Sequence, residues 1–316
     1  MKRALIVGSD GQDGSLLYDR LTGDGVPALG LARNSIRGGG GNEFKPVGVH
    51  SRTDVKSLLK KWRPSEIYYL AAVHQASEDA VKADDARLFE ESLSVHVTGL
   101  VNFLDVLKEM LPHASVFYAA SSLVFGDAEV SPQDERTPFQ PRCIYGITKV
   151  AGVQACRYYR ERHGVHVSAG LLYNHESPIR RENFVSRKIV RAATNIAAGG
   201  RDKLVIGNLS AQVDWGYAPD VIDAMIRIVR QPGSDDYIVA TGETHSVQEF
   251  VEIAFERLGL DWRLHVEERP MLLTRRSTLR VGDATRLREQ TGWRPTISFR
   301  RMVEILVDAE RGVHAA

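Results

Sequence analysis

Hydrophobic and polar positions divide the first 174 residues into short apolar runs that alternate with amphipathic stretches. Runs such as ALIV at 4–7 and EIYYLAA at 66–72 contain too few polar positions for a strand with one face in water. Such strands, separated by helices, are typical of a parallel sheet covered on both faces. The pattern predicts strands at 3–8, 26–33, 66–72, 114–121 and 165–174, and helices over Leu16, Leu17 and Leu21 and at 55–62, 88–110 and 145–163.

The alternation becomes looser after Asn174. Helices are predicted at 183–198, 219–230 and 246–258, and strands at 202–208 and 236–241. We therefore predict an α/β fold, a doubly wound parallel sheet with a smaller C-terminal mixed α/β domain. The first domain is expected over 1–174 and the second mainly over 175–316, with the segments around 216–242 returning to the first. GGGG at 38–41 indicates a loop rather than a domain boundary.

Composition and charge narrow the class of protein. Of the 316 residues, 43% are hydrophobic and 26% are charged, as in ordinary soluble globular proteins. The formal net charge of +1 provides no broad field for nucleic acid or a membrane, so neither partner is expected. The apolar runs are far shorter than the roughly 20 residues of a membrane helix, and the start lacks a signal-peptide h-region. These features predict a cytoplasmic protein.

Cysteine and histidine positions indicate neither a disulfide framework nor a metal site. Two cysteines, Cys143 and Cys156, are too few for a framework or a four-thiolate site. The histidines lack the spacing of metal ligands, so no metal is predicted.

The sequence GSDGQDG at 8–14 places three glycines between the first predicted strand and the first predicted helix. Glycine permits a tight turn and lets a pyrophosphate approach the helix N-terminus, where free N–H groups and the helix dipole favour negative charge. This strand–glycine–helix context favours a Rossmann dinucleotide site over a turn with incidental glycines. The cofactor-binding residues predicted here are Gly8, Gly11, Gln12, Asp13 and Gly14.

The end of the second strand indicates which dinucleotide binds. An NAD site usually has Asp or Glu there to bond the ribose hydroxyls, but this strand ends in Arg33, Asn34 and Ser35. A guanidinium can pair with a 2′-phosphate through charge-assisted hydrogen bonds. We therefore predict NADP as the cofactor, with Arg33 as a ligand. The alternative is that Arg33 is a solvated surface residue.

Ser121, Tyr145 and Lys149 form a candidate redox site. Tyr145 and Lys149 are four apart on a predicted helix and share a face, so the ammonium is expected to lower the tyrosine pKa. Ser121 ends an adjacent strand and can bond the same substrate oxygen. Together they can move a proton on or off a hydroxyl while hydride passes to or from a nicotinamide. We predict all three as catalytic, with Tyr145 and Lys149 also contacting the cofactor.

Motifs along nearly the whole chain resemble one enzyme family. The glycine pattern, LAA at 70–72, Ser121 and YGITK at 145–149 resemble extended short-chain dehydrogenases/reductases. Segments similar to GDP-mannose 4,6-dehydratases are NHESPIRRENFVSRKI (174–189), IGNLSAQVDWGYAPDVIDAM (206–225) and IVATGETHSVQEFVE (238–252). The resemblance implies an NADP-dependent homodimer or homotetramer that acts on a nucleotide-linked hexose, with GDP as the expected nucleotide. It adds Leu70, Ala71 and Ala72 to the cofactor site.

The resemblance also implies substrate-binding residues in the C-terminal part. Asn174 is expected near the sugar and the nicotinamide, and Asn183, Val185 and Lys188 near the guanine nucleotide. The complete implied set is Asn174, Glu176, Asn183, Val185, Lys188, Gly207 and Arg276.

Leu123 departs from the family pattern. The dehydratases resembled here have Thr-Ser-Glu at the catalytic hydroxyl, whereas this chain has Ser121, Ser122 and Leu123. Elimination of water across C5 and C6 needs a base and an acid, and loss of such a group costs about 10²–10⁴-fold in rate. Hydride transfer at C4 needs only Tyr145, Lys149, the serine and the cofactor.

Val213 is a second departure, because the family has an arginine there that is expected to bind the diphosphate. Arg275, Arg276 or Arg280 could replace its charge, and spacing does not decide among them. His96 stands where the family usually has Asn or Asp, and no role is assigned to it.

Three hypotheses follow. The favoured one is a nucleotide-sugar 4-ketoreductase or related C4 redox enzyme, because Leu123 stands beside a complete redox trio. The second is a GDP-mannose 4,6-dehydratase that uses another base, for which Glu176 is a candidate. The third is a non-catalytic nucleotide-sugar binder, which would need neither Tyr145 nor Lys149.

Overall fold

The computed structural model describes residues 2–39, 44–73, 84–270 and 279–312. A seven-stranded sheet forms its centre, in the order β11-β6-β5-β4-β1-β2-β3, and every pair is parallel except β2 with β3. The strands are β1 (Ala4–Val7), β2 (Ala28–Leu31), β3 (Ile36–Gly38), β4 (Glu66–Tyr69), β5 (Ser115–Ala119), β6 (Val167–Leu172) and β11 (Asp236–Val239). The predicted doubly wound α/β fold is confirmed.

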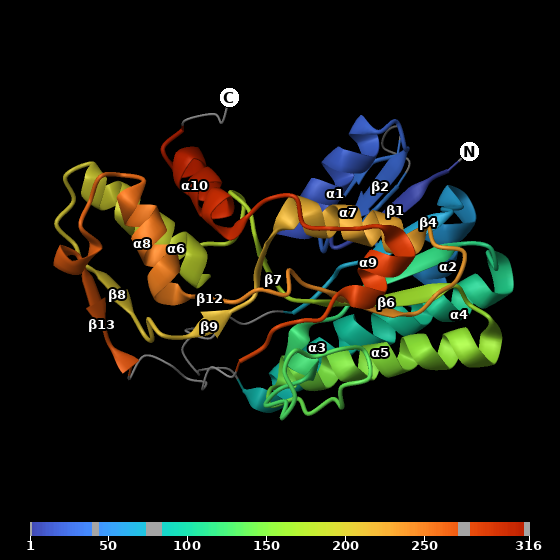
Figure 1. Cartoon of the computed structure of the whole chain (residues 1–316). Helices are drawn as coiled ribbons and strands as arrows, with labels where there is room; N and C mark the ends of the chain where they lie inside the picture. Colours follow the sequence, from blue (N-terminus) through green and yellow to red (C-terminus); the bar gives the residue numbers. More distant parts are fainter. Residues whose placement is uncertain (1, 40–43, 74–83, 271–278, 313–316) are drawn as a thin grey trace.

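Helices cover both faces of this sheet, as the uniformly apolar strands require (Figure 1). They are α1 (Gln12–Gly23), α2 (Arg52–Trp62), α3 (Asp85–Leu93), α4 (Leu100–Met110), α5 (Ile144–His163) and α7 (Ala218–Val229). α1 packs with α7 on one face, whereas α4 and α5 pack together on the other. Each residue of β1, β2, β4 and β11 is buried, so these strands contribute to one continuous hydrophobic core. Within the described residues no helix is both long and apolar enough to cross a bilayer.

The prediction of one helix over 88–110 was wrong in one respect. Between α3 and α4 the chain makes a π-helical segment, η1 (Ser94–Gly99), which turns His96 into the core. The ring accepts from the Val73 N–H at Nε2 (2.9 Å) and faces the Thr148 hydroxyl at Nδ1 (2.8 Å). Because an N–H only donates, Nδ1 carries the proton and donates to Thr148. His96, unassigned from sequence, therefore joins the end of β4 to α5.

A second hydrophobic cluster lies to the left in Figure 1, around α6 (Val185–Ala197), α8 (Val247–Glu256) and α10 (Phe299–Glu310). Short strand pairs border it. They are β8 (Leu204–Ile206) with β13 (Val266–Glu268), and β9 (Gln212–Val213) with β12 (His245–Ser246).

Several C-terminal segments pack on the first core. These are α7, β11 and α9 (Thr285–Thr291), together with Ala284 and Trp293. Residues 284–293 lie outside the segment around 216–242 that was expected to return. β7 (Asn174–Glu176) pairs with β10 (Trp215–Tyr217) where the chain passes between the two clusters.

Candidate active site

A cleft of about 1610 Å³ opens beyond the carboxyl ends of β1, β2, β4, β5 and β6 and reaches to β8 and β9. Pockets for one drug-sized ligand usually measure about 300–1,000 Å³, so this cleft has room for a dinucleotide and a second ligand. Most of the predicted site residues line it together: Gly8, Gly11, Gln12, Asp13, Gly14, Arg33, Leu70, Ala71, Ala72, Ser121, Tyr145, Lys149, Asn174, Asn183, Val185 and Gly207.

Two of the described residues that were predicted to bind substrate, Glu176 and Lys188, are not among the residues that line the cleft. Glu176 is 2% exposed, and its carboxylate accepts from the Ser186 hydroxyl (2.6 Å) and lies 3.4 Å from Arg180 Nε. Its charge is thus used inside the protein, which disfavours it as the substitute base. Lys188 is half-buried on α6. Arg276 lies outside the described residues.

The glycine loop, residues 8–14, forms a closely packed cradle in which two of the glycines have no room for a side chain. A Cβ on Gly8, whose φ is +97°, would meet the Ala71 nitrogen at 2.7 Å, and one on Gly14 would meet the Gly8 oxygen at 2.2 Å. α1 begins at Gln12, and its N-cap residue Gly11 provides no side-chain cap. The first N–H groups of α1 are therefore available for an anion such as a pyrophosphate.

Asp13 and His175 form an ion pair beside this cradle. His175 Nε2 lies 3.0 Å from both Asp13 oxygens, and its Nδ1 lies 2.7 Å from the Tyr173 carbonyl oxygen. Both partners accept, so the ring carries both protons and is an imidazolium. Burial alone would raise the pKa of Asp13, but the charge and hydrogen bond of His175 outweigh it and hold the pKa at about 2. Burial opposes protonation of His175, and Asp13 outweighs it, so the pKa of His175 is raised.

Gln12 extends this link between the glycine loop and β7. Its Nε2 donates to the His175 carbonyl (3.2 Å), and its Oε1 accepts from the Ser177 hydroxyl (2.8 Å). Arg180 lies on the same side, with its guanidinium 3.6 Å from the centre of the Phe184 ring. The side chains of Gln12 and Asp13 are thus hydrogen-bonded within the protein. Their contribution to a cofactor would come from their backbone N–H groups.

The end of β2 presents Arg33, Asn34 and Ser35 to the cleft as exposed residues. The other basic side chain here, Arg37, donates to Asp19 (2.6 Å) and lies over the Tyr18 ring at 3.9 Å. Arg33 therefore lies at the place where a 2′-phosphate is expected, and no acid follows β2 before β3.

Lys149 and Tyr145 lie on the first turns of α5, inside the cleft. Lys149 is 1% exposed, and its Nζ donates to the Ala119 carbonyl (2.6 Å) and lies 5.5 Å from the centre of the Tyr145 ring. Burial lowers the pKa of Lys149 to about 7. Burial, assisted by the charge of Asp13, raises the pKa of Tyr145 although Arg180 opposes it.

The expected lowering of the Tyr145 pKa is therefore not observed. Burial disfavours the charged form of both groups, so it raises the pKa of Tyr145 and lowers that of Lys149, and for Tyr145 this outweighs the expected effect of the ammonium. Tyr145 is a neutral phenol in this structure and is suited to donate a proton. The His96 ring contacts it edge-on, at 5.3 Å between centroids.

Ser121 stands at the end of β5 and begins a 3₁₀ turn, η2 (Ser122–Val124). Its Oγ accepts from the Leu123 N–H (3.2 Å), which leaves the hydroxyl proton available to a substrate oxygen. Leu123 is the middle residue of this turn and lines the cleft. The acids among the described lining residues come from other segments: Asp10, Asp13, Glu90, Glu91 and Asp127.

His175, Arg180 and Arg280 also line the cleft but were not predicted as site residues. His175 and Arg180 belong to NHESPIRR, a motif already singled out, so the motif was a usable signal for them. Arg280 had been named only as one of three possible charges. No pattern in the sequence distinguishes it from Arg275 and Arg276, which lie outside the described residues.

The sheet order, the glycine cradle after β1 and the tyrosine–lysine pair on α5 define a short-chain dehydrogenase/reductase. Two solved structures share this fold. UDP-glucose 4-epimerase from Thermus thermophilus in complex with NAD has a TM-score of 0.78 at 22% identity, over 98% of this chain and 99% of that one. RMD from Pseudomonas aeruginosa complexed with NADPH has a TM-score of 0.81 at 20% identity, over 97% and 98%.

Within this class, the chain belongs to the GDP-mannose 4,6-dehydratase family. The family model for GDP-mannose 4,6 dehydratase matches residues 5–306. GDP-mannose 4,6 dehydratase 1 from Arabidopsis thaliana is 36% identical over 332 aligned positions, which cover 98% of this chain and 90% of the relative. GDP-mannose 4,6-dehydratase from Sinorhizobium fredii is 35% identical, with coverage of 95% and 93%. The family is one of enzymes, as the redox trio predicted.

Proposed function

We propose that this protein is an NADP-dependent nucleotide-sugar oxidoreductase that acts at C4 of a GDP-linked hexose, as a 4-ketoreductase that does not eliminate water. The observation that carries the proposal is the meeting of Ser121, Tyr145 and Lys149 in one cleft beside Leu123. The first three supply what carbonyl reduction requires. The fourth has no proton to give or take at the position where the dehydratases have glutamate.

The described residues of the cleft fit an NADP cofactor. Gly8 and Gly14 let the cradle pack closely where a Cβ would meet backbone atoms, and Arg33 lies where β2 ends. The cradle and the start of α1 would hold the pyrophosphate, and Arg33 the 2′-phosphate. When bound, the nicotinamide supplies the hydride that adds to the C4 carbonyl carbon.

The protein's own groups supply the proton. Ser121 Oγ–H donates a hydrogen bond to the C4 carbonyl oxygen, which orients and polarises it. Tyr145 Oη–H transfers its proton to that oxygen, so that C=O becomes CH–OH. Lys149, one turn further along α5, stabilises the phenolate that remains. The raised pKa of Tyr145 supports this direction, because the free enzyme holds the proton that the reduction consumes.

A second candidate function is the GDP-mannose 4,6-dehydratase reaction itself. The identity of 36% over 98% of the chain favours it. It requires a base other than Glu176, whose carboxylate is engaged by Ser186 and Arg180. The third hypothesis is a non-catalytic binder. It is disfavoured because binding alone does not require a buried lysine beside a tyrosine, as Lys149 and Tyr145 are here. The oligomeric state and the cytoplasmic location stay predictions.

The test follows product mass and NADPH absorbance with purified protein. With GDP-mannose and NADP⁺ we expect no product that has lost water. With a 4-keto-6-deoxy GDP-hexose and NADPH we expect NADPH consumption and a product heavier by two hydrogens. Tyr145→Phe is the inactive control. Loss of one water from GDP-mannose by the wild-type protein would establish the dehydratase instead.

A matched variant tests the role of Leu123. Leu123→Glu restores the carboxyl group of the family pattern beside the trio. If the missing acid/base is what limits the chemistry to redox, this variant releases water from GDP-mannose and the wild-type protein does not. Leu123→Gln, of similar shape but unable to transfer a proton, is the control and should release none.

A further inference from the structure

The backbone of Leu123 contacts the segments of both groups that are expected to bind the substrate carbonyl oxygen, Ser121 and Tyr145. Its N–H donates to Ser121 Oγ (3.2 Å), and the N–H of Val124 donates to the Ser121 carbonyl oxygen (3.1 Å). On the other side, the Leu123 carbonyl oxygen packs against α5 at Gly146, where a Cβ would meet it at 2.6 Å. Gly146 directly follows Tyr145 in the chain. The position of Leu123 is therefore fixed relative to both groups.

The loop that follows this turn is closed on itself and anchored to two other parts of the chain. Its two ends are joined by the hydrogen bond from the Gln140 N–H to the Val124 carbonyl oxygen (2.9 Å). In its middle, Gln133 is 0% exposed, and its N–H donates to the Val281 carbonyl oxygen (2.8 Å). Its Oε1 accepts from the Val281 N–H (3.1 Å) and the Tyr173 hydroxyl (2.9 Å). Gln133 thus ties this loop to the end of β6 and to the segment before α9.

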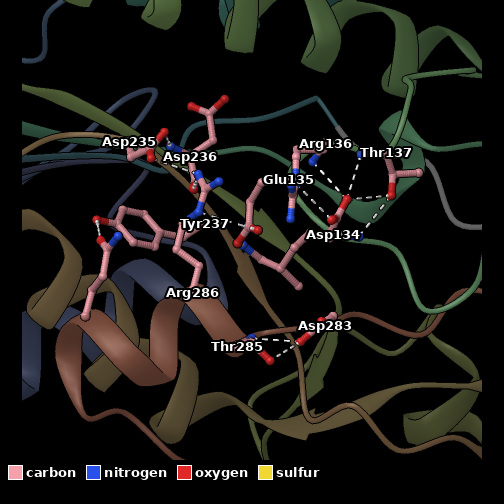
Figure 2. Close-up of polar contacts among 12 residues, drawn as sticks. Asp134, Glu135, Arg136, Thr137, Asp235, Asp236, Tyr237, Asp283, Thr285 and Arg286 are labelled. Carbon is pink, nitrogen blue, oxygen red and sulfur yellow. Dashed lines mark hydrogen bonds and ion pairs between the residues drawn. The ribbon is translucent and has the colours of Figure 1, made fainter.

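Salt bridges fasten the next part of the loop, as Figure 2 shows. The Glu135 carboxylate accepts from the Ile238 N–H of β11 (3.0 Å) and lies 3.6 Å from Arg286 Nε. Arg286 also pairs with Asp235 at 2.8 Å. The loop is therefore attached to the central sheet and to α9, so Leu123 stands on a wall of the cleft whose backbone is well anchored.

Position 123 presents an apolar side chain to the cleft. Leu123 is half-buried and lines the cleft beside Ser121. The charged lining residues of the adjoining segments, Asp127 and Arg142, pair with each other at 3.3 Å. A hydroxyl packed against Leu123 would exchange water for a contact with carbon, which is unfavourable, whereas a methyl group there gains from burial.

The chemistry of a hexose limits which of its groups fits against Leu123. When Ser121 and Tyr145 hold the oxygen at C4, the substituents of the two neighbouring ring carbons, C3 and C5, lie closest to the walls on either side. C3 of an ordinary hexose carries a hydroxyl, and C5 carries CH₂OH or, in a 6-deoxy hexose, CH₃. The C6 methyl group is the only apolar substituent of the ring, so it is the one that a leucine beside Ser121 fits.

We propose that Leu123 is a specificity-determining residue, which contacts the C6 methyl group of a 6-deoxy hexose and discriminates against a sugar with a hydroxyl at C6. The inference deepens the proposed function and rests on it, because it requires C4 of the sugar at Ser121 and Tyr145. Leucine at position 123 thus has two consequences. It provides no group for proton transfer, and it supplies an apolar surface that selects the substrate.

The experiment compares GDP-mannose with GDP-6-deoxymannose, two ligands that differ only by the C6 hydroxyl. Binding to the whole protein is measured by isothermal titration calorimetry with NADPH present. NADPH does not reduce the C4 hydroxyl of either ligand, so the titration measures binding without turnover. We expect the wild-type protein to bind GDP-6-deoxymannose about 10- to 100-fold more tightly, the discrimination that an apolar pocket achieves against an added hydroxyl.

Two variants test whether the side chain at position 123 causes this preference. Leu123→Gln brings a group that can pair with the C6 hydroxyl, so the preference for GDP-6-deoxymannose should fall about tenfold or more. Leu123→Met, which is apolar and of similar volume, should keep the preference. GDP alone has no sugar, so it should bind to all three proteins with equal affinity and serves as the check of an intact fold. If Leu123→Gln does not bind GDP, Leu123→Ala takes its place and should also lower the preference, because most of the apolar contact is gone.

The outcomes separate this inference from the proposed function. If the wild-type protein binds neither sugar nucleotide, the proposed substrate class is wrong and the role of Leu123 is wrong with it. If it binds both ligands equally well, or if Leu123→Gln keeps the wild-type preference, the selection of C6 by Leu123 is overturned and redox activity at C4 is not. A preference that is lost in Leu123→Gln and kept in Leu123→Met supports the assignment.

Discussion

The two walls of the cleft are built in different ways. The cofactor wall consists of the glycine loop, residues 70–72 and the start of α5, and each part follows directly from a strand of the sheet or packs on one. The substrate wall consists of residues 173–185, 206–213 and 280, which the long-range contacts of Gln133 and Asp214 bring together. The cofactor wall therefore depends mainly on backbone shape, and the substrate wall depends on a few buried polar side chains that join distant segments.

Leu123 and Val213, which were predicted to differ from the family pattern, lie in parts of the cleft where the packing permits a different side chain. Leu123 and Val213 both line the cleft, yet neither belongs to the cradle. A cradle that rejects a Cβ at Gly8 and Gly14 cannot change without losing its shape.

Loss of the Tyr145 hydroxyl should change the activity most, because it slows hydride transfer without weakening cofactor binding. Tyr145→Phe removes the proton donor and should lower the rate of hydride transfer about 10²–10⁴-fold, the cost of losing a positioned general acid. NADPH affinity should change little, because the ring still packs against His96. Stopped-flow absorbance gives the rate and fluorescence titration gives the affinity. Turnover close to wild type would show that another group donates the proton.

A substitution of Gln133 is expected to weaken the packing of the substrate wall and to leave the cofactor wall unchanged. Gln133→Leu leaves the Val281 N–H and the Tyr173 hydroxyl without their acceptor, at about 1–3 kcal/mol for each buried group. Urea unfolding should show the loss, and GDP should bind more weakly while NADPH binds as before. Gln248→Leu, at an exposed position on α8, is the control and should change stability by less than about 0.5 kcal/mol. Equal weakening of both ligands would mean that the walls are not independent.

A third prediction tests the dinucleotide end alone. Arg33→Ala should weaken NADPH about 10- to 100-fold and leave NADH unchanged, since only NADPH has the 2′-phosphate. Arg37→Ala is the matched control, because its guanidinium is already paired with Asp19. If Arg33→Ala keeps the wild-type preference between NADPH and NADH, Arg33 is a solvated surface residue and does not bind the 2′-phosphate.

The smallest effect concerns the ion pair that joins the walls. Asp13 has a pKa of about 2 instead of 3.8, so it contributes about 2 kcal/mol of stability above pH 3.8, which is lost as the pH falls toward 2. The pKa of His175 is raised above 6.5, so its share is complete below pH 6.5 and is lost as the pH rises through the folded value. The stability difference between wild type and His175→Gln should therefore be largest between pH 3.8 and 6.5.

Thermal unfolding across that range measures the difference. Asp13→Asn should show the same dependence, because it removes the other partner of the same pair. A difference that does not vary with pH would mean that the two residues contribute packing rather than charge.

The parts of the fold that depend on local pattern were predictable from the sequence. ALIV followed by GSDGQDG specifies a buried strand, a tight turn and a helix N-terminus within a few residues, and the structure has all three. YGITK places Tyr145 and Lys149 on one helical face for the same reason.

The parts that depend on distant contacts were not predictable in this way. Nothing near Arg280 indicates that Gln133, 147 residues earlier, fixes its backbone. The sequence also shows Glu176 as an available carboxylate, although Ser186 and Arg180 engage it in the folded chain. The π-helical segment at Ser94–Gly99 is hidden too, because its residues suit an ordinary helix equally well.

The π-helical segment makes the position of His96 depend on the number of residues between α3 and α4. A π turn takes up one residue more than the regular ladder of hydrogen bonds, so α3 and α4 keep their faces while the residues inside the turn change direction. Removing one residue from Ser94–Gly99 would let the ladder close into a continuous α-helix and would remove the wide turn that directs His96 into the core. His96 would then leave Thr148 and the edge of the phenol. The length of this stretch, as well as its composition, sets the surroundings of the proton donor.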